Sequence, residues 1–126
     1  MQGREAAVLS RNEFGSAVKQ ALRNYQRADQ LRHNPLLRAR ILARRPGGAV
    51  PVGELPVLLA EASGRLFAGA RDQKYHRVLD LTYFNPAPKQ EAAADRLGLP
   101  FSTYRRHLRA GITRLVSLLW QRELEG

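Results

Sequence analysis

Arg105, Arg106 and Arg109 are the residues whose type and spacing best suit binding chemistry. No Asp or Glu occurs between Asp95 and Glu123, so these arginines lie in an acid-free stretch. A guanidinium group is planar and always charged, and it donates paired hydrogen bonds to a phosphate or to the O6 and N7 atoms of guanine. A merely solvated basic face is the simpler explanation. Contact with a phosphate or with the edge of a base is the functional alternative.

Catalytic and cofactor chemistry find no support in the sequence. The chain has no cysteine, which excludes disulfides, zinc-finger sites and thiol catalysis. No serine stands in a nucleophile-elbow pattern, and Pro46-Gly47-Gly48 lacks the residues that flank a phosphate-binding loop. The histidines, His33, His76 and His107, are far apart in the chain. We therefore expect a protein that is not an enzyme and that uses no cofactor and no metal.

The net charge of +10 predicts attraction to a polyanion. Residues 1–48 carry ten basic against three acidic side chains, so most of the excess lies in the N-terminal part. The predicted short helix over residues 36–45 carries Arg38, Arg40, Arg44 and Arg45. Their arrangement fits contact with phosphates and simple solvation equally well. The residues predicted as possible phosphate contacts are Arg38, Arg40, Arg44, Arg45 and Lys89.

Apolar periodicity predicts an all-α chain of about six helices. Ser10 and Glu13 form a capping-box pattern at the first helix, and Phe14, Val18 and Leu22 follow on one face. Asp72 is expected to cap the fourth helix. The later helices are expected at residues 36–45, 54–68, 72–84, 88–97 and 102–124. The predicted organisation is a basic helical unit, residues 1–69, on which a C-terminal helix-turn-helix domain, residues 70–126, packs.

Residues 90–108, QEAAADRLGLPFSTYRRHL, have the pattern of a helix-turn-helix. Small residues, Ala93 and Ala94, stand where the two helices must touch, and Gly98 stands in the turn. Ser102 is placed to cap the second helix. Such a helix presents its first outward residues to the major groove of DNA. The apolar residues expected to lock the pair are Leu97, Leu99, Tyr104 and Leu108.

Residues 78–119 resemble region four of bacterial sigma factors and the related C-terminal domains of response regulators. The matching pieces are Val78-Leu79 with Leu81, Tyr83-Phe84, Glu91-Ala92-Ala93, Leu97-Gly98-Leu99, Ser102-Thr103-Tyr104, Leu108 and Arg114-Leu115. The resemblance implies an all-helical domain whose last helix reads bases. It places that role on Ser102, Thr103, Arg105, Arg106 and Arg109. Arg105 or Arg106, nearest the start of the helix, is expected to read a base. Arg109 and Arg114, further along the helix, are expected to touch the DNA backbone.

The expected function is sequence-specific binding of double-stranded DNA in bacterial transcription regulation. The rest of the chain does not resemble the promoter-melting region of a sigma factor. A small regulator, or the C-terminal module of a larger one, is therefore expected. RNA polymerase or a regulatory protein is a possible partner. Residues 116–120 are either core or the seam of a homodimer through the C-terminal helix.

The main alternative is a helical interaction module that holds RNA polymerase or another regulator without touching DNA. RNA binding is weaker, because the chain lacks aromatic stacking motifs. No apolar stretch approaches the roughly 20 residues that span a bilayer. The N-terminus also lacks the apolar run of a secretory signal. A cytoplasmic protein without a membrane partner is therefore expected.

Overall fold

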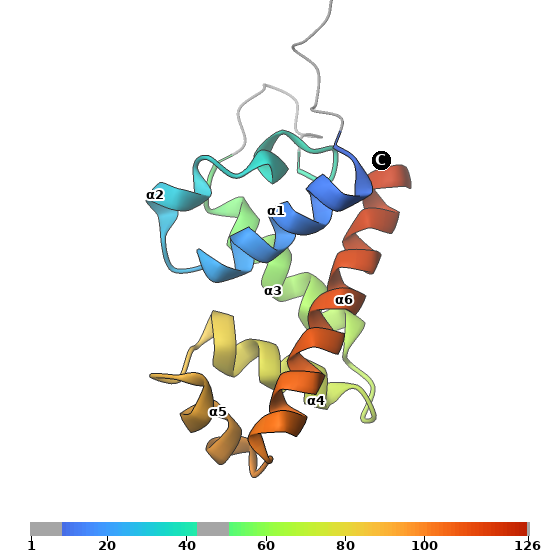
Figure 1. Ribbon diagram of the computed structural model, residues 1–126. Coiled ribbons are helices and arrows are strands. Elements are labelled where there is room, and N and C mark those ends of the chain that lie inside the picture. The colour runs from blue at the N-terminus through green and yellow to red at the C-terminus, as the bar shows by residue number, and fades with distance from the viewer. Residues whose placement is uncertain (1–8, 43–50, 126) are drawn as a thin grey trace, which may run out of the picture.

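The structure, a computed structural model, describes residues 9–42 and 51–125, and every regular element within these stretches is helical. This confirms the prediction of an all-α chain with about six helices. The described elements are α1 (Arg11–Arg23), α2 (Ala28–Leu31), the 3-10 helix η1 (Pro35–Arg38), α3 (Glu54–Leu66), α4 (Gln73–Leu79), the π-helix η2 (Asp80–Phe84), α5 (Gln90–Leu97) and α6 (Phe101–Glu125) (Figure 1).

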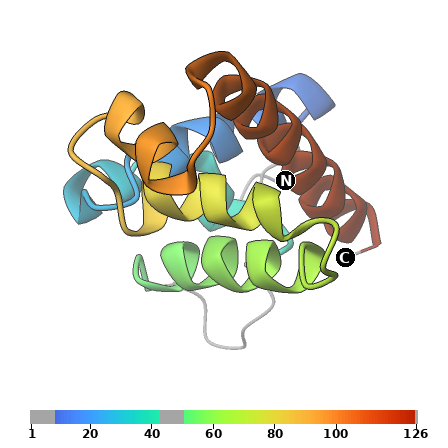
Figure 2. The same cartoon turned by 90° about the horizontal axis from the view of Figure 1, so that it is seen from below.

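The longest helix, α6, is the element on which the others pack. It contacts α1, α3, α4 and α5. Figure 1 shows α5 beside the first turns of α6 at one end of the molecule, with α1, α2 and η1 towards the other. Seen from below in Figure 2, α4 lies between α3 and α5. The pair α5–α6 therefore lies at one end of the fold, and α4 packs against both helices.

The start of α1 follows from its sequence. The Ser10 hydroxyl accepts the amide of Glu13 at 3.0 Å, and the Glu13 carboxylate accepts the amide of Ser10 at 2.8 Å. This reciprocal pair confirms the predicted capping box and satisfies two amide groups that the first helical turn leaves free. The apolar side of α1 is buried, with Phe14 and Val18 fully covered.

The predicted helix over residues 36–45 is wrong for its described part. Only one 3-10 turn forms, Pro35–Arg38, and Ala39 then has an extended backbone. The buried Asn34 side chain accepts the amide of Leu36 and donates to the carbonyl of Ala17 in α1, both at 2.9 Å. These bonds hold the chain against α1 in a tight turn. The short helix α2, just before this turn, was not predicted.

The Glu123 carboxylate, near the end of α6, explains why the turn does not continue as a helix. It accepts the backbone amides of Arg40 at 3.1 Å and of Ile41 at 3.0 Å. These two amides therefore bond to a residue far along the chain instead of to carbonyls four residues back. Glu123 itself is 7% exposed, so the link is part of the interior.

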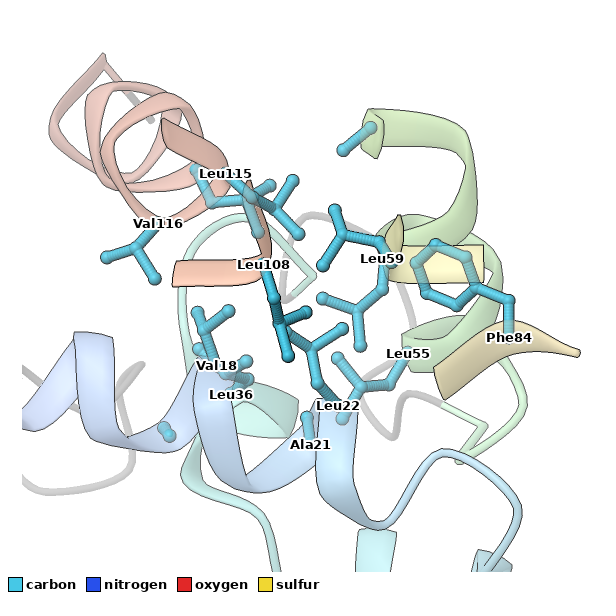
Figure 3. Close-up of a cluster of buried hydrophobic side chains, with 14 of the residues drawn as sticks. Val18, Ala21, Leu22, Leu36, Leu55, Leu59, Phe84, Leu108, Leu115 and Val116 are labelled. Carbon is cyan, nitrogen blue, oxygen red and sulfur yellow. The ribbon is translucent and has the colours of Figure 1, made fainter. Parts of the chain in front are cut away.

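A hydrophobic core joins both halves of the chain (Figure 3). Figure 3 shows Val18 and Leu22 of α1 facing Leu108 of α6, with Leu55 and Leu59 of α3 closing the cluster. The C-terminal stripe that was a candidate dimer seam also packs inward. Val116 and Leu119 are buried, and Trp120 meets the ring of Phe14 edge-on at 5.2 Å. The stripe is therefore core packed against α1.

Helix α4 ends in a wider turn than the sequence predicts. The expected α-helix to Phe84 gives way after Leu79 to the π-helix η2. The Asn85 amide bonds back to the Asp80 carbonyl at 2.7 Å, one residue further than in an α-helix. The Thr82 hydroxyl donates to the Val78 carbonyl at 2.6 Å, which adds a side-chain bond to this segment.

Candidate nucleic-acid interface

The turn between α5 and α6 is built around Gly98, as predicted. Its φ of 67° lies in the left-handed region, which glycine adopts without strain. The Leu99 amide bonds to the Ala94 carbonyl and the Gly98 amide to the Asp95 carbonyl, both at 3.0 Å. This is the Schellman arrangement, which satisfies carbonyls left free at a helix end. The chain leaves α5 sharply here and re-enters a helix at Phe101.

Ser102 does not cap α6, so that prediction is wrong. The helix already begins at Phe101, and the Pro100 carbonyl accepts the amide of Tyr104 at 2.9 Å. Pro100 therefore occupies the capping position, and Ser102 lies inside the first turn with its side chain exposed. Thr103 beside it is half-buried.

The inner sides of both motif helices are apolar and buried, as the small residues predict. Ala93 of α5 is fully buried and Ala94 nearly so. On α6, Tyr104 is completely covered and Leu108 is 8% exposed. Leu97 and Leu99, which were expected to lock the pair, are half-buried and pack against this core.

An outward row of polar and cationic side chains runs along the first half of α6. Its members are exposed and recur at spacings of four, three and four, which places them on one face of a helix. Arg106 lies opposite the buried side formed by Tyr104 and Leu108. This outward row consists of Ser102, Arg106, Arg109 and Thr113.

Arg105 points to one flank of this row. Its guanidinium carbon lies 5.8 Å from the ring centre of Phe101, a cation–π distance. Phe101 is 38% exposed and stacks on Tyr104, with ring centres 6.0 Å apart. The exposed ring at the start of α6 therefore helps to hold the arginine in place.

A basic groove of about 470 Å³ lies between α1, the start of α5 and the first half of α6. Its cations are Lys19 and Arg23 from α1, with Arg105 and Arg109 from α6. No carboxylate is among its lining residues. Lys19 and Arg23 were not among the residues predicted from the sequence, because only the packing of α1 on α6 brings them beside the motif. The groove is completed by Gln90, Leu108, Ile112 and Thr113.

Arg114, predicted to touch DNA, has contacts inside the protein. Its guanidinium donates to both carboxylate oxygens of Asp72, at 3.1 and 3.3 Å. It also lies 5.2 Å from the ring centres of Phe67 and Tyr75. Asp72 stands before α4, but its side chain makes no cap hydrogen bond, so the predicted capping role is wrong. Arg114 ties α6 to the α3–α4 connection while its side chain stays 42% exposed, so its predicted contact with DNA stays a prediction.

The Asp72–Arg114 pair gives a prediction for the pH dependence of stability. The hydrogen bond from Arg114 holds the pKa of Asp72 below its ordinary value of 3.8. A lowered folded pKa stabilises the fold above the unfolded value, and this contribution is lost as pH falls through the folded value. Asp72→Asn and Arg114→Leu should each flatten the loss of unfolding free energy at acid pH. Urea titrations between neutral pH and pH 3 measure how the unfolding free energy changes with pH. If both variants lose stability at acid pH as steeply as the parent does, the pairing is contradicted.

His107 packs as a neutral ring on the side of α6 that faces α4. It meets the ring of Tyr75 edge-on at 5.8 Å. Its burial, and then the charges of Lys74 and Arg106, lower its pKa. Its Nδ1 atom is buried without a hydrogen-bond partner among the described residues. His107 therefore adds no positive charge to the interface at neutral pH.

The remaining predicted phosphate contacts are dispersed. Lys89 is exposed directly before α5, close to the motif. Arg38 and Arg40 are exposed at the other end of the molecule, where the Arg40 amide meets Glu123. That point lies about 27 Å along α6 from Arg105, at 1.5 Å per residue. Arg44 and Arg45 are outside the described residues.

Neither a metal centre nor a membrane segment is found in the described chain. Residues 9–42 and 51–125 contain no group of three or more His, Asp or Glu placed to hold a metal ion. No helix in these stretches has the length and apolar character needed to cross a membrane. Comparison of the chain with protein-family models, with curated proteins and with solved structures found no match.

Proposed function

We propose that this protein binds double-stranded DNA and regulates transcription, with the first half of α6 entering the major groove. The outward row of α6 carries the proposal. It presents Arg106 and Arg109 from a helix that follows a short turn, in a stretch of sequence without acidic residues. The resemblance to region four of sigma factors supports the same assignment. A major groove about 12 Å wide admits one α-helix with its side chains.

Arg106 is the residue that we assign to reading a base. It lies near the start of α6 and points directly away from the core, so its guanidinium can extend to the floor of a groove. There it pairs with the O6 and N7 atoms of guanine. Arg105 and Arg109 line the basic groove on the flank of α6, where the sugar-phosphate backbone passes. The structure thus favours Arg106 over Arg105 for base contact, two residues that the sequence left equivalent.

A protein-interaction module remains the second candidate, because the exposed Phe101 ring suits an apolar partner. The two functions differ in their requirement for nucleic acid. A sequence-specific DNA-binding protein prefers a selected duplex over random duplex at moderate salt. An adaptor with the same net charge of +10 binds all duplexes alike, and only at low salt. Duplex RNA and a no-nucleic-acid sample complete the comparison, since A-form RNA hides its major groove from side chains.

The test begins with selection of a preferred duplex from a random library by the full chain. Binding of the parent and of Arg106→Ala is then measured on the selected duplex and on random duplex at two salt concentrations. We expect Arg106→Ala to cost about 1–3 kcal/mol on the selected duplex and to relax the preference at one base pair. Arg77→Ala is the matched control, because Arg77 is an exposed arginine on α4 outside the outward row.

Two results would count against the proposal. If the parent binds no duplex at low salt, DNA binding is excluded and the interaction module becomes the better explanation. If the parent binds a selected duplex but Arg106→Ala behaves like Arg77→Ala on every sequence, Arg106 does not read a base. A thermal melt of each variant shows whether the fold is retained.

A further inference from the structure

The basic groove brings together cations from parts of the chain that are distant in sequence. Lys19 and Arg23 lie on α1, and Arg105 and Arg109 lie on α6. All four side chains are exposed. The groove lining contains four cationic side chains and no carboxylate. The cations therefore repel one another, and no acidic residue of the lining offsets this repulsion. Clustered like charges of this kind destabilise a fold and attract an external anion.

The two helices that carry these cations are both anchored in the hydrophobic core. On α1, Val18 and Leu22 are buried immediately beside Lys19 and Arg23. On α6, Leu108 is 8% exposed and forms part of the groove lining as well as of the core. The spacing of the charges is therefore set by the packing of α1 on α6 before any ligand arrives.

Further features of the groove suit an anion. Gln90 is the first residue of α5 and lines the groove, so the positive end of that helix faces it. Lys89 before it makes no side-chain cap hydrogen bond. A neighbouring hollow of about 240 Å³ shares Lys19 and Thr113 with the groove and adds Arg11.

The shape of this charged surface fits an extended polyanion better than a small one. From Arg11 to Arg23 the cations follow α1 for about 18 Å at 1.5 Å per residue. One DNA strand presents a phosphate every 3.4 Å or so of duplex axis. The exposed cations Arg11, Lys19 and Arg23 therefore extend along α1 over more than one phosphate spacing, whereas a small anion would meet only one or two of them.

We propose that the basic groove holds the phosphate backbone of one DNA strand, so that Lys19 and Arg23 of α1 belong to the DNA interface together with Arg105 and Arg109. The inference rests on the proposed function, because α6 must lie against duplex DNA. It assigns the N-terminal part of the chain a direct share in binding. That share falls on α1 and not on Arg38 and Arg40, which the sequence suggested and which lie at the other end of the molecule.

The experiment compares two double variants of the full chain. Lys19→Gln with Arg23→Gln removes two charges from the groove. Arg32→Gln with Arg65→Gln removes two exposed charges from α2's end and from α3, outside the groove lining. We expect the groove variant to bind selected and random duplex at least about ten-fold more weakly. Its slope of log K against log salt should be flatter by nearly two units, because each lost phosphate contact removes about 0.9.

The base preference of the groove variant should stay that of the parent, unlike that of Arg106→Ala. Its melting temperature should be unchanged or higher, because two mutually repelling charges are gone. A variant exchanging the two residues, Lys19→Arg with Arg23→Lys, keeps both charges and should keep the salt slope. If the exchange flattens the slope as much as the glutamines do, charge is not the cause and the inference is overturned.

The outcomes separate this inference from the function on which it rests. A parent that binds no duplex overturns both. A parent that binds a selected duplex, together with a groove variant that matches the Arg32→Gln, Arg65→Gln control in affinity and slope, overturns only the role of α1. A groove variant that is weaker than this control, with a flatter slope and an intact fold, supports it.

Discussion

Truncation of Tyr104 to alanine should lower the free energy of unfolding by about 3–5 kcal/mol, the range for buried aromatic side chains. Tyr104 is fully covered and is among the largest buried side chains of the chain. It lies where α6 meets η2, and its hydroxyl is hydrogen-bonded to the Thr82 hydroxyl. Because the Thr82 proton is given to the Val78 carbonyl, Tyr104 must be the donor in that pair. The alanine variant therefore loses both packing and a buried bond.

Tyr104→Phe separates these two losses. It retains the ring and removes only the hydroxyl, so we expect a cost of about 0.5–1.5 kcal/mol. Urea unfolding of the parent and both variants, followed by circular dichroism, provides the measurement. A loss under 1 kcal/mol for the alanine variant would mean that Tyr104 is not buried in the core as described. Because Tyr104 also positions the start of α6, the alanine variant should bind a selected duplex more weakly than the phenylalanine variant does.

The second large effect is expected at Glu123. Its replacement by alanine leaves the amides of Arg40 and Ile41 without their acceptor. Two hydrogen bonds to a charged group, at about 1.5–3 kcal/mol each, set an expected loss of roughly 3 kcal/mol after solvent partly replaces them. Glu123→Gln keeps one acceptor oxygen and should cost about half as much.

Amide hydrogen exchange tests the effect of Glu123→Ala at the two backbone amides that the carboxylate binds. The amides of Arg40 and Ile41 should exchange faster in Glu123→Ala than in the parent, relative to the amides in the middle of α6. Leu124→Ala is the matched control, because Leu124 is the next residue and is 60% exposed. Unchanged exchange at both amides in Glu123→Ala would show that the carboxylate does not hold this turn.

Local sequence signals predicted the helices well where the reasons are local. The capping box of Ser10 and Glu13, the left-handed Gly98 and the apolar stripe of α1 all depend on residues within a few positions of one another. Where a distant residue intervened, the prediction was wrong. The helix expected over residues 36–45 was replaced by a 3-10 turn because Asn34 bonds to α1 and Glu123 takes two amides.

In the candidate interface, too, the features with local causes were predicted from the sequence, and those that depend on distant segments were not. The pattern of residues 90–108 predicted the sharp turn at Gly98 and the burial of Tyr104 and Leu108. It did not distinguish the outward Arg106 from Arg105, which faces the basic groove. Helical periodicity places Arg106 opposite Tyr104 and Leu108 once those two residues are known to be buried. That Arg105 lines a basic groove depends on where α1 lies relative to α6, which periodicity within one segment does not show.

By itself, the sequence determined that this chain is helical, that α5 ends at a glycine turn, and that residues 96–122 are rich in arginine and free of acids. Tertiary structure decided which charges are available to a ligand. It paired Arg114 with Asp72 and placed Lys19 and Arg23 of α1 beside α6. The physical reason is that helix formation depends on neighbours within about four positions, whereas ion pairs and grooves depend on how distant segments share the apolar core.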